Sequence, residues 1–239
     1  MIELKNVSKS FGSKKAVDDL SAVVPSGSIT GFIGPNGAGK TTTINMMTGI
    51  LAPDAGTILL NGKNIVTDPV EAKKQFVLVP DTPDVFLRLT GREYIRFIGR
   101  IYQVDPQTIE TRMKELADEF ELTDSLDDQM NSYSHGMRQK AIVIAALVCD
   151  PYIWFLDEPM TGLDPRSSFI LKEKMKEHAA RNKTVFFSTH VLEVAEKLCD
   201  KILLINHGKI QYDGTLENLR ERHPGLSLEE IFMKETADE

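Results

Sequence analysis

The sequence is poor in cysteine and in long apolar runs. Its two cysteines, Cys149 and Cys199, fit no metal-binding spacing, so we expect reduced, buried thiols in a reducing compartment. The longest uninterrupted apolar run, Ala141–Cys149, is too short for a membrane span, which needs about 20 residues. The start, MIELKNVSKSFG, lacks the apolar h-region of a signal peptide. We therefore expect a cytoplasmic chain that reaches the inner face of a membrane only through a partner.

An excess of positive charge is also lacking. Lysine and arginine number 28 against 35 acidic residues, which gives a net charge of −7 and argues against a nucleic-acid partner. A nucleotide is not excluded, because a phosphate site needs only local positive potential. With 239 residues, 41% of them hydrophobic, the chain can form one α/β domain with an inserted lobe.

Three β-rich runs each end in polar residues suited to chemistry. Ser28–Ile33 precedes GPNGAGKTT, Tyr152–Leu156 precedes an Asp-Glu pair, and Thr184–Phe187 precedes STH. Helical patterns lie between these runs, as in a parallel α/β sheet. Ligands bind at the carboxyl edge of such sheets, so these residues should meet there.

The chain between the runs predicts two additions to the parallel sheet. Asn61-Gly62 between two β-rich runs is typical of a type I′ hairpin, and it indicates an antiparallel piece near the N-terminus. From about residue 84 to 148, apolar residues recur at helical spacing. We expect one domain: an α/β core over about 1–82 and 149–213, a helical lobe over about 84–148, and a tail over about 214–239.

The run GPNGAGKT at 34–41 matches the P-loop pattern G-x-x-x-x-G-K-[ST] between a predicted strand and a predicted helix, Lys40–Met47. Glycines let backbone amides turn toward phosphate, and the helix N-terminus adds partial positive charge. Lys40 would reach the β- and γ-phosphates, and Thr41 would offer a hydroxyl to Mg²⁺. The predicted ATP-binding residues here are Gly34, Pro35, Asn36, Gly37, Ala38, Gly39, Lys40, Thr41 and Thr42.

The carboxylate pair after the second run has two separable roles. Asp157, at the end of a buried strand, is placed to hold Mg²⁺ through a bound water. Glu158 would accept a proton from the attacking water, and strand alternation would point it away from Asp157. A helix cap formed by Asp157 is the simpler alternative.

Five segments together resemble one family across nearly the whole chain. They are GPNGAGKTT, YSHGMRQK at 133–140, YIWFLDEP at 152–159, TGLD at 161–164 and STH at 188–190. In this order and spacing they are similar to the ATPase domain of ABC (ATP-binding cassette) transporters. The segment at 133–140 corresponds to the family signature, usually LSGGQ.

The resemblance implies that hydrolysis needs a dimer. Ser134 and Gly136 match the signature, and Ser134 is predicted to cap the following helix. In the family this helix end closes over the ATP held by a second subunit, so that two MgATP are sandwiched head to tail. A helix cap without a ligand is the alternative interpretation.

The resemblance assigns three further residues. His190 corresponds to a switch histidine that contacts the γ-phosphate and positions Glu158 and the water. Asp164 corresponds to a loop that communicates across the dimer, and Phe11 to an aromatic residue that stacks on adenine. An aromatic side chain in a strand can also belong to the core.

The sequence departs from the family pattern at three positions. Pro80 is followed by Asp81, where the family has a glutamine that binds Mg²⁺ and connects the site with the groove for the membrane subunit. We predict that Asp81 binds the metal directly or through water. His135 replaces a signature glycine, and Met137 replaces the signature glutamine.

The predicted function is an ATP-binding and ATP-hydrolysing subunit of an ABC transporter, with Mg²⁺ as the cofactor. It would work as a homodimer or heterodimer and drive substrate movement, by export, through a separate membrane permease. A soluble ABC ATPase of a cofactor-assembly complex remains the alternative. A chromosome or DNA-repair ATPase would need a long coiled-coil insertion that this chain lacks.

Overall fold

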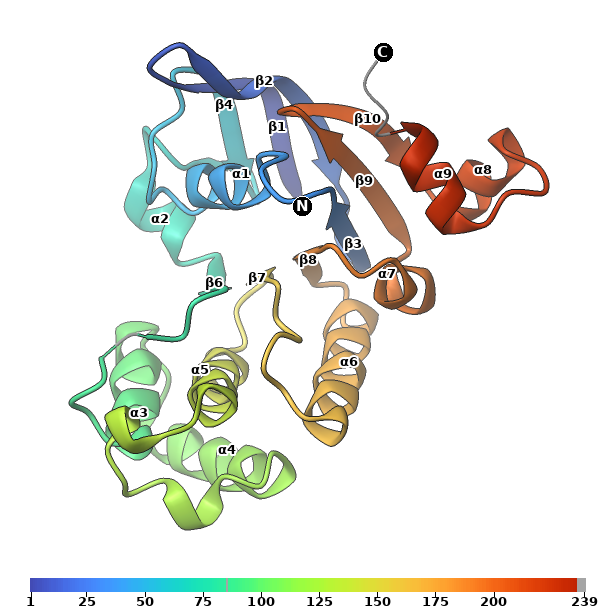
Figure 1. The fold of residues 1–239 in the computed structure, drawn as a ribbon. Coiled ribbons are helices and arrows are strands. Elements are labelled where there is room, and N and C mark those ends of the chain that lie inside the picture. Colours follow the sequence, from blue (N-terminus) through green and yellow to red (C-terminus); the bar gives the residue numbers. More distant parts are fainter. Residues whose placement is uncertain (85, 236–239) are drawn as a thin grey trace.

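The computed structural model describes residues 1–84 and 86–235, which form two sheets and a group of helices (Figure 1). A six-stranded sheet has the order β10-β9-β3-β8-β7-β6, and a four-stranded sheet has the order β2-β1-β4-β5. The strands are β1 (Ile2–Phe11), β2 (Lys14–Val24), β3 (Ser28–Ile33), β4 (Ala55–Leu60), β5 (Lys63–Asn64), β6 (Phe76–Val79), β7 (Ile153–Asp157), β8 (Thr184–Thr189), β9 (Lys201–Asn206) and β10 (Lys209–Gly214).

The larger sheet is parallel except at one edge. Strand β3 pairs in parallel with β8 and β9, and β7 pairs in parallel with β6 and β8, while β10 runs antiparallel to β9. In this register Ile33 lies beside Thr189, and Asp157 lies beside Ser188. The carboxyl ends of the three predicted β-rich runs therefore meet at one edge, which confirms the predicted parallel sheet.

The smaller sheet is antiparallel throughout. Strand β1 pairs with β2 and β4, and β4 pairs with β5. Asn61 and Gly62 have φ values of 48° and 78°, the left-handed geometry that a type I′ turn requires. The predicted hairpin is confirmed.

The helices divide between the core and the predicted helical segment. In Figure 1, α3, α4 and α5 lie together at the end of the molecule opposite the antiparallel sheet. The element α5 is longer than its apolar run, because Ser134 caps it seven residues before Ala141. The helices are α1 (Lys40–Met47), α2 (Pro69–Lys73), α3 (Gly91–Ile101), α4 (Pro106–Glu119), α5 (His135–Cys149), α6 (Pro165–Ala180), α7 (Leu192–Leu198), α8 (Leu216–Arg222) and α9 (Leu228–Glu235), with 3₁₀ turns η1 (Thr123–Ser125) and η2 (Met130–Ser132).

The helical group shares its core with the parallel sheet. One apolar cluster contains Trp154 and Val185 of the sheet together with Tyr94 of α3 and Phe120 after α4. A second cluster fills the space between the two sheets and includes Phe32 and α1. Burial of this apolar surface is the main stabilising term of the fold. Among the described residues, no helix has the length and apolar character to cross a membrane.

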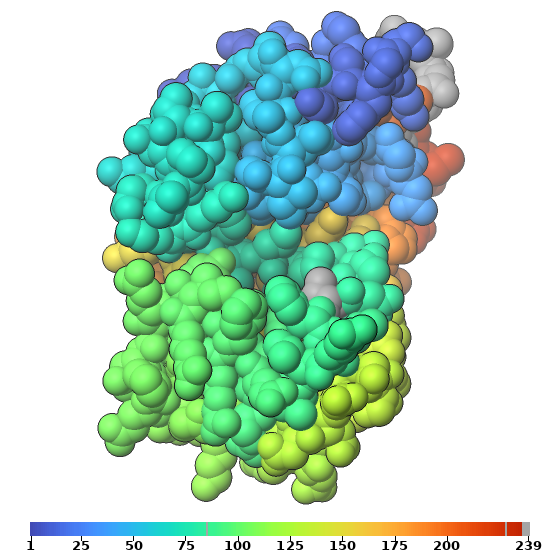
Figure 2. Space-filling model, turned by 90° about the vertical axis from the view of Figure 1, so that its left-hand side faces the viewer, coloured from blue at the N-terminus to red at the C-terminus, as the bar shows by residue number. Residues whose placement is uncertain are grey.

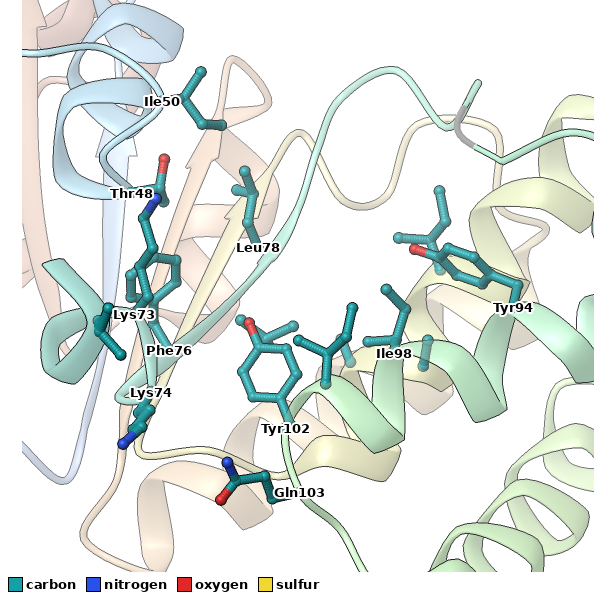
Figure 3. Close-up of a pocket in the computed structure, with 16 residues that line it drawn as sticks. Thr48, Ile50, Lys73, Lys74, Phe76, Leu78, Tyr94, Ile98, Tyr102 and Gln103 are labelled. Atoms are coloured by element: carbon teal, nitrogen blue, oxygen red, sulfur yellow. The ribbon is translucent and has the colours of Figure 1, made fainter.

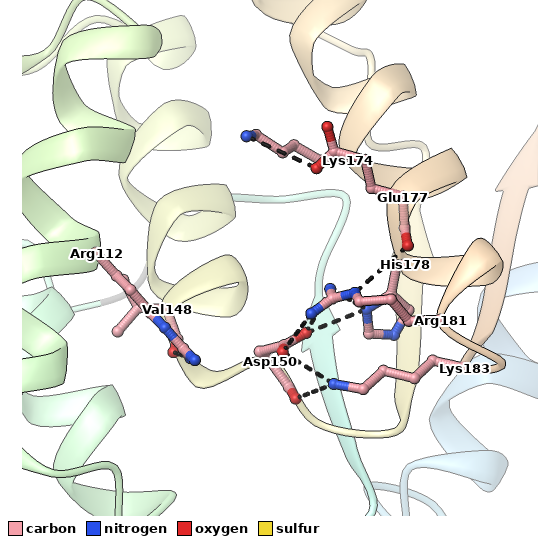
Figure 4. A network of polar contacts seen from close by, with 8 residues as sticks. All are labelled: Arg112, Val148, Asp150, Lys174, Glu177, His178, Arg181 and Lys183. Carbon is pink, nitrogen blue, oxygen red and sulfur yellow. Dashed lines mark hydrogen bonds and ion pairs between the residues drawn. The ribbon is translucent and has the colours of Figure 1, made fainter.

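A polar network surrounds Asp150, which ends α5 in a left-handed conformation just before β7 (Figure 4). Arg181 makes a bidentate pair with its carboxylate at 2.8 and 2.9 Å, and Lys183 approaches it at 2.9 Å. The buried His178 lies 3.3 Å away through Nδ1, with its ring stacked on Trp154. Burial alone would raise the pKa of Asp150, but hydrogen bonds from His178, Lys183 and Arg181 hold it below its ordinary value.

Candidate functional site

A cleft of about 350 Å³ opens where the P-loop meets the carboxyl ends of β6 and β7. The P-loop connects β3 to α1, so its backbone lies at the edge of the sheet where ligands bind. The lining residues are Phe11, Lys14, Ala16, Asn36, Gly37, Gly39, Lys40, Thr41, Thr42, Asp81, Asp157 and Glu158. Lys14 and Ala16 were not predicted, because β2 is distant in sequence and carries no phosphate-binding motif.

Two P-loop glycines are required by close backbone contacts. A Cβ on Gly34 would lie 2.3 Å from the carbonyl oxygen of Ile205, and one on Gly39 would lie 2.5 Å from that of Ala16. Gly39 also has a φ of 110°, which side chains rarely adopt. Packing against β2 and β9 therefore fixes the shape of the loop.

Lys40 is buried and turned toward its own loop. Its Nζ donates to the carbonyl oxygens of Gly34 and Pro35, at 2.7 and 3.2 Å, and lies 3.9 Å from Glu158. Burial lowers its pKa, and the nearby carboxylates of Glu158, Asp157 and Asp81 oppose that effect. The ammonium group thus donates to neutral carbonyl oxygens. It can exchange these for the negatively charged oxygens of a phosphate group, which bind a cation more strongly.

Asp157 ends β7 as a buried carboxylate whose direct side-chain hydrogen bonds come from hydroxyl groups, with the charge of Lys40 nearby. Ser188 Oγ and the Thr41 hydroxyl donate to it. Burial raises the pKa of Asp157, these hydrogen bonds oppose the rise, and Asp81 adds to it. A cation placed here would remove the main cost of keeping this carboxylate ionised. Ser188 was not assigned a role in the sequence, although it begins the STH run.

Glu158 differs from its predicted geometry. It follows β7 rather than belonging to it, and its φ of 46° places it in the left-handed region. Strand alternation therefore does not separate it from Asp157; a left-handed backbone does. Its amide donates to Ser188 Oγ at 3.0 Å, and Nδ1 of His190 donates to its carboxylate at 3.0 Å. The structure thus brings Glu158, His190 and Lys40 together.

The donor set fits Mg²⁺ bound together with a nucleotide. Thr41, Asp157 and Asp81 offer oxygen atoms on one side of the cleft, and hard cations prefer oxygen. Across residues 1–84 and 86–235, no group of three His, Cys, Asp or Glu side chains could hold a metal alone. Mg²⁺ is commonly held by one or two carboxylates plus substrate phosphates, so this sparse set suits it.

The predicted dimer-facing residues lie outside this cleft. Ser134 caps α5 by accepting from Met137 N at 3.2 Å. Asp164 caps α6 by accepting from Ser167 N at 2.9 Å, and Lys140 pairs with it at 2.8 Å. The two caps are adjacent, because the residue after Ser134 packs against the loop before Asp164. A Cβ on Gly162 would lie 2.3 Å from Cδ2 of the His135 ring. Ser134 and Asp164 thus form one surface, separate from the chain's own P-loop.

Comparison with known proteins decides the family. The model of the family described as ABC transporter matches residues 17–161. The chain belongs to the ABC transporter family. It is 37% identical to the ABC transporter ATP-binding protein NatA of Bacillus subtilis over 98% of this chain and 97% of that protein. It is 36% identical to the Nod factor export ATP-binding protein I of Burkholderia lata over 97% of this chain and 76% of that protein.

Solved structures place this ABC subunit in the same fold. A structure described as an ATP binding subunit of an ABC transporter has a TM-score of 0.94 and 33% identity, and the match covers 99% of this chain and 100% of that one. The predicted α/β fold with antiparallel and helical additions is therefore confirmed. In this ABC chain, the roles of the individual site residues remain predictions.

Proposed function

We propose that this chain hydrolyses ATP as the motor subunit of an ABC exporter, working as a dimer around two MgATP and acting through a separate membrane subunit. The observation that carries the proposal is the convergence of the P-loop, Asp157, Glu158 and His190 on one cleft edge. The sequence relatives support the direction of transport, since one of them is named for export.

The proposed hydrolysis assigns roles to six side chains of the site. Lys40 leaves the carbonyl oxygens of its loop and binds the β- and γ-phosphates, which keeps its charge paired in the buried site. Glu158 accepts the proton of the attacking water, and His190 holds the Glu158 carboxylate in place through Nδ1. Asp157, Thr41 and Asp81 would hold Mg²⁺, which supplies neutralisation of the phosphate charge when bound.

The surface that contains Ser134 supports the proposed dimer. The first-turn amides of α5 form a positive helix end, but the chain's own P-loop lies elsewhere. A second subunit in head-to-tail orientation would bring its ATP to this helix end, including Ser134 and Gly136. Phe11 at the cleft mouth is 53% exposed and is available to stack on the adenine of the chain's own ATP.

A membrane subunit has a place to bind in an apolar groove of about 660 Å³ between α2, β6 and α3. Figure 2 shows the hollow between the cyan and green parts of this face. In Figure 3, Ile98 and Tyr102 of the α3 region face Phe76 and Leu78 across it. Ile50, Val70 and Ile101 are exposed here, which is unusual for an isolated soluble protein and typical of a partner site. An apolar helix of the membrane subunit fits this groove.

Affinity purification from detergent-solubilised native membranes tests the proposal. We expect a multi-span membrane protein to co-purify with the wild-type chain, and Val70→Asp, which places a charge in the groove, to lose it. The purified chain should hydrolyse ATP. Recovery of soluble partners alone would support the cofactor-assembly ATPase and overturn the membrane partner. Absence of hydrolysis in the complex would overturn the motor function.

A further inference from the structure

A second cavity, of about 140 Å³, lies between the helical group and the core. Arg112 of α4, Lys174 of α6 and Trp154 of β7 line it, and among the described residues none lines both this cavity and the nucleotide cleft. Trp154 precedes Asp157 by three residues in β7, which separates the two Cα atoms by ~10 Å. The cavity is therefore a separate site from the nucleotide cleft.

Trp154 brings an unpartnered hydrogen-bond donor to this cavity. The residue is only 2% exposed, and in the described part of the chain its Nε1 has no hydrogen-bond partner. An indole N–H can only donate, and a buried donor without an acceptor costs free energy. A single water molecule needs only ~10–15 Å³, so the cavity has room for a larger acceptor.

Two cationic side chains reach the cavity from opposite sides. In Figure 4, Arg112 lies on one side of Asp150 and Lys174 on the other. Arg112 donates through Nη1 to the Val148 carbonyl oxygen at 2.8 Å, and this is its only hydrogen bond to a described residue. A guanidinium group has five N–H donors, so Arg112 keeps donors for a ligand.

The negative end of α5 also lies at this cavity, and cations already neutralise it. Arg112 and Lys183 donate to the carbonyl oxygens of Val148 and Asp150, each at 2.8 Å. The Asp150 carboxylate is paired with Arg181 and Lys183. These contacts offset the partial negative charge of a helix C-terminus, which would otherwise repel an anion.

Glu177 is the second carboxylate that lines the cavity. Its side chain is 64% exposed and lies 3.9 Å from Lys174, which also pairs with Glu119 at 2.9 Å. A pair this long and exposed is weak, so an anion in the cavity can replace Glu177 at Lys174.

We propose that this cavity binds a small oxyanion of the phosphate class, either free phosphate or the phosphate group of a phosphomonoester. Its oxygen atoms would accept from Trp154 Nε1, the Arg112 guanidinium and the Lys174 ammonium. These donors come from three elements, which suits tetrahedral oxygen atoms better than the two coplanar ones of a carboxylate. The bound anion would connect α4 with α6 and β7.

Fluorescence of the full chain tests the proposal, because Trp154 is its only tryptophan. The chain is titrated with sodium phosphate and, separately, with sodium chloride at equal ionic strength. We expect a saturable change of emission with phosphate alone. Glycerol 2-phosphate is the second probe: equal or tighter binding indicates a phosphomonoester, and its exclusion indicates free phosphate.

Three variants of the lining residues should shift the phosphate titration in predicted directions. Arg112→Gln and Lys174→Gln each remove a charge-assisted donor and should weaken binding roughly tenfold or more. Glu177→Gln removes a competing carboxylate and should tighten binding by a few-fold. Lys176→Gln is the matched control, because it removes the same charge from an exposed position of α6 outside the cavity.

Phosphate also suits the P-loop, so Lys40→Ala separates the two sites. The fluorescence response should persist in this variant, since Lys40 does not line the cavity. Loss of the response in Lys40→Ala would assign it to the nucleotide cleft and overturn the proposal.

Two further results would overturn the phosphate site. One is an equal change with chloride, which would show general screening of charge. The other is an unchanged titration in both Arg112→Gln and Lys174→Gln. A variant that unfolds is recognised by red-shifted emission before any anion is added, and the other variant then decides.

Discussion

Strand β7 has an aspartate near each end, and the protein treats the two carboxylates in opposite ways. Asp150, before the strand, is surrounded by Arg181, Lys183 and His178, which outweigh burial and hold its pKa low (Figure 4). Asp157, at the other end, accepts from the hydroxyl groups of Ser188 and Thr41, and burial raises its pKa because these bonds and the nearby Lys40 do not outweigh it. The protein thus stabilises the ionised form of Asp150 with cationic neighbours, whereas the surroundings of Asp157 disfavour its ionised form.

We interpret this difference as a difference in role: Asp150 stabilises the fold, and Asp157 is predicted to bind a cation. A carboxylate that is satisfied within the fold connects elements, here α5, α6 and β8, and gains nothing from a ligand. When a buried carboxylate has a raised pKa, binding of a cation from solution stabilises its ionised form. We therefore expect changes near Asp157 to affect turnover and changes at Asp150 to affect stability.

The largest expected effect is at Glu158. Glu158→Gln keeps the size of the side chain but removes the proton acceptor, so turnover should fall about 10²–10⁴-fold while ATP still binds. Phosphate release and nucleotide titration measure the two quantities. Glu177→Gln, beside the Asp150 network, is the control and should keep full turnover. Full turnover in Glu158→Gln would contradict the assignment of the base.

Lys40→Ala should lower the affinity for nucleotide rather than the rate at which bound ATP is hydrolysed. A charge-assisted hydrogen bond contributes about 1.5–3 kcal/mol, which corresponds to roughly 10–150-fold in the dissociation constant. Fluorescence titration with an ATP analogue measures it. Lys14→Ala is the matched control, because Lys14 lines the same cleft but is exposed. Equal losses in both variants would reject a specific phosphate contact for Lys40.

At the other end of β7, Asp150→Asn should reduce the free energy of unfolding by about 2–3 kcal/mol at pH 7 and leave ATP affinity unchanged. The folded pKa of Asp150 lies below its unfolded value of about 3.9, so its stabilisation is complete above that pH and lost as the pH falls through the folded pKa. Urea denaturation between pH 7 and 3 should therefore show the difference narrowing below about pH 4. A constant difference would exclude the charged pairing as its source.

The smallest expected effect is at Asp81. Asp81→Gln replaces a charged oxygen ligand with a neutral one, which should shift the Mg²⁺ concentration for half-maximal hydrolysis a few-fold, roughly 1 kcal/mol or less. A titration of hydrolysis with Mg²⁺ at fixed ATP measures it. An unchanged titration would remove Asp81 from the predicted metal ligands.

Local motifs made the P-loop and its helix predictable. Lys40–Met47 has the predicted bounds, since glycine spacing and the following helix are encoded by consecutive residues. The hairpin at Asn61-Gly62 was predictable for the same reason. Polar residues at the ends of β7 and β8 could be assigned to one edge because parallel strands place their carboxyl ends together.

Contacts between distant segments were not predictable. The Asp150 network joins residues about 30 positions apart, and no pattern in the local sequence around Asp150 indicates these contacts. Ser188 acquires a role only when β8 lies beside β7. The left-handed Glu158 was missed because non-glycine residues with positive φ are uncommon, and the sequence pattern favoured a simple continuation of the strand.

The position of β3 in the sheet has a consequence for synthesis of the chain. The P-loop follows β3 directly, but β3 lies between β8 and β9, which begin at Thr184 and Lys201. After Ile33 leaves the ribosome, ~150 further residues must be made before either neighbour exists, which takes roughly 8–30 s at typical rates. During that time the glycine-rich loop follows a strand that lacks both of its neighbours in the parallel sheet. Nucleotide binding is therefore a property of the nearly finished chain, and a nascent chain stalled before β8 should be unable to retain ATP.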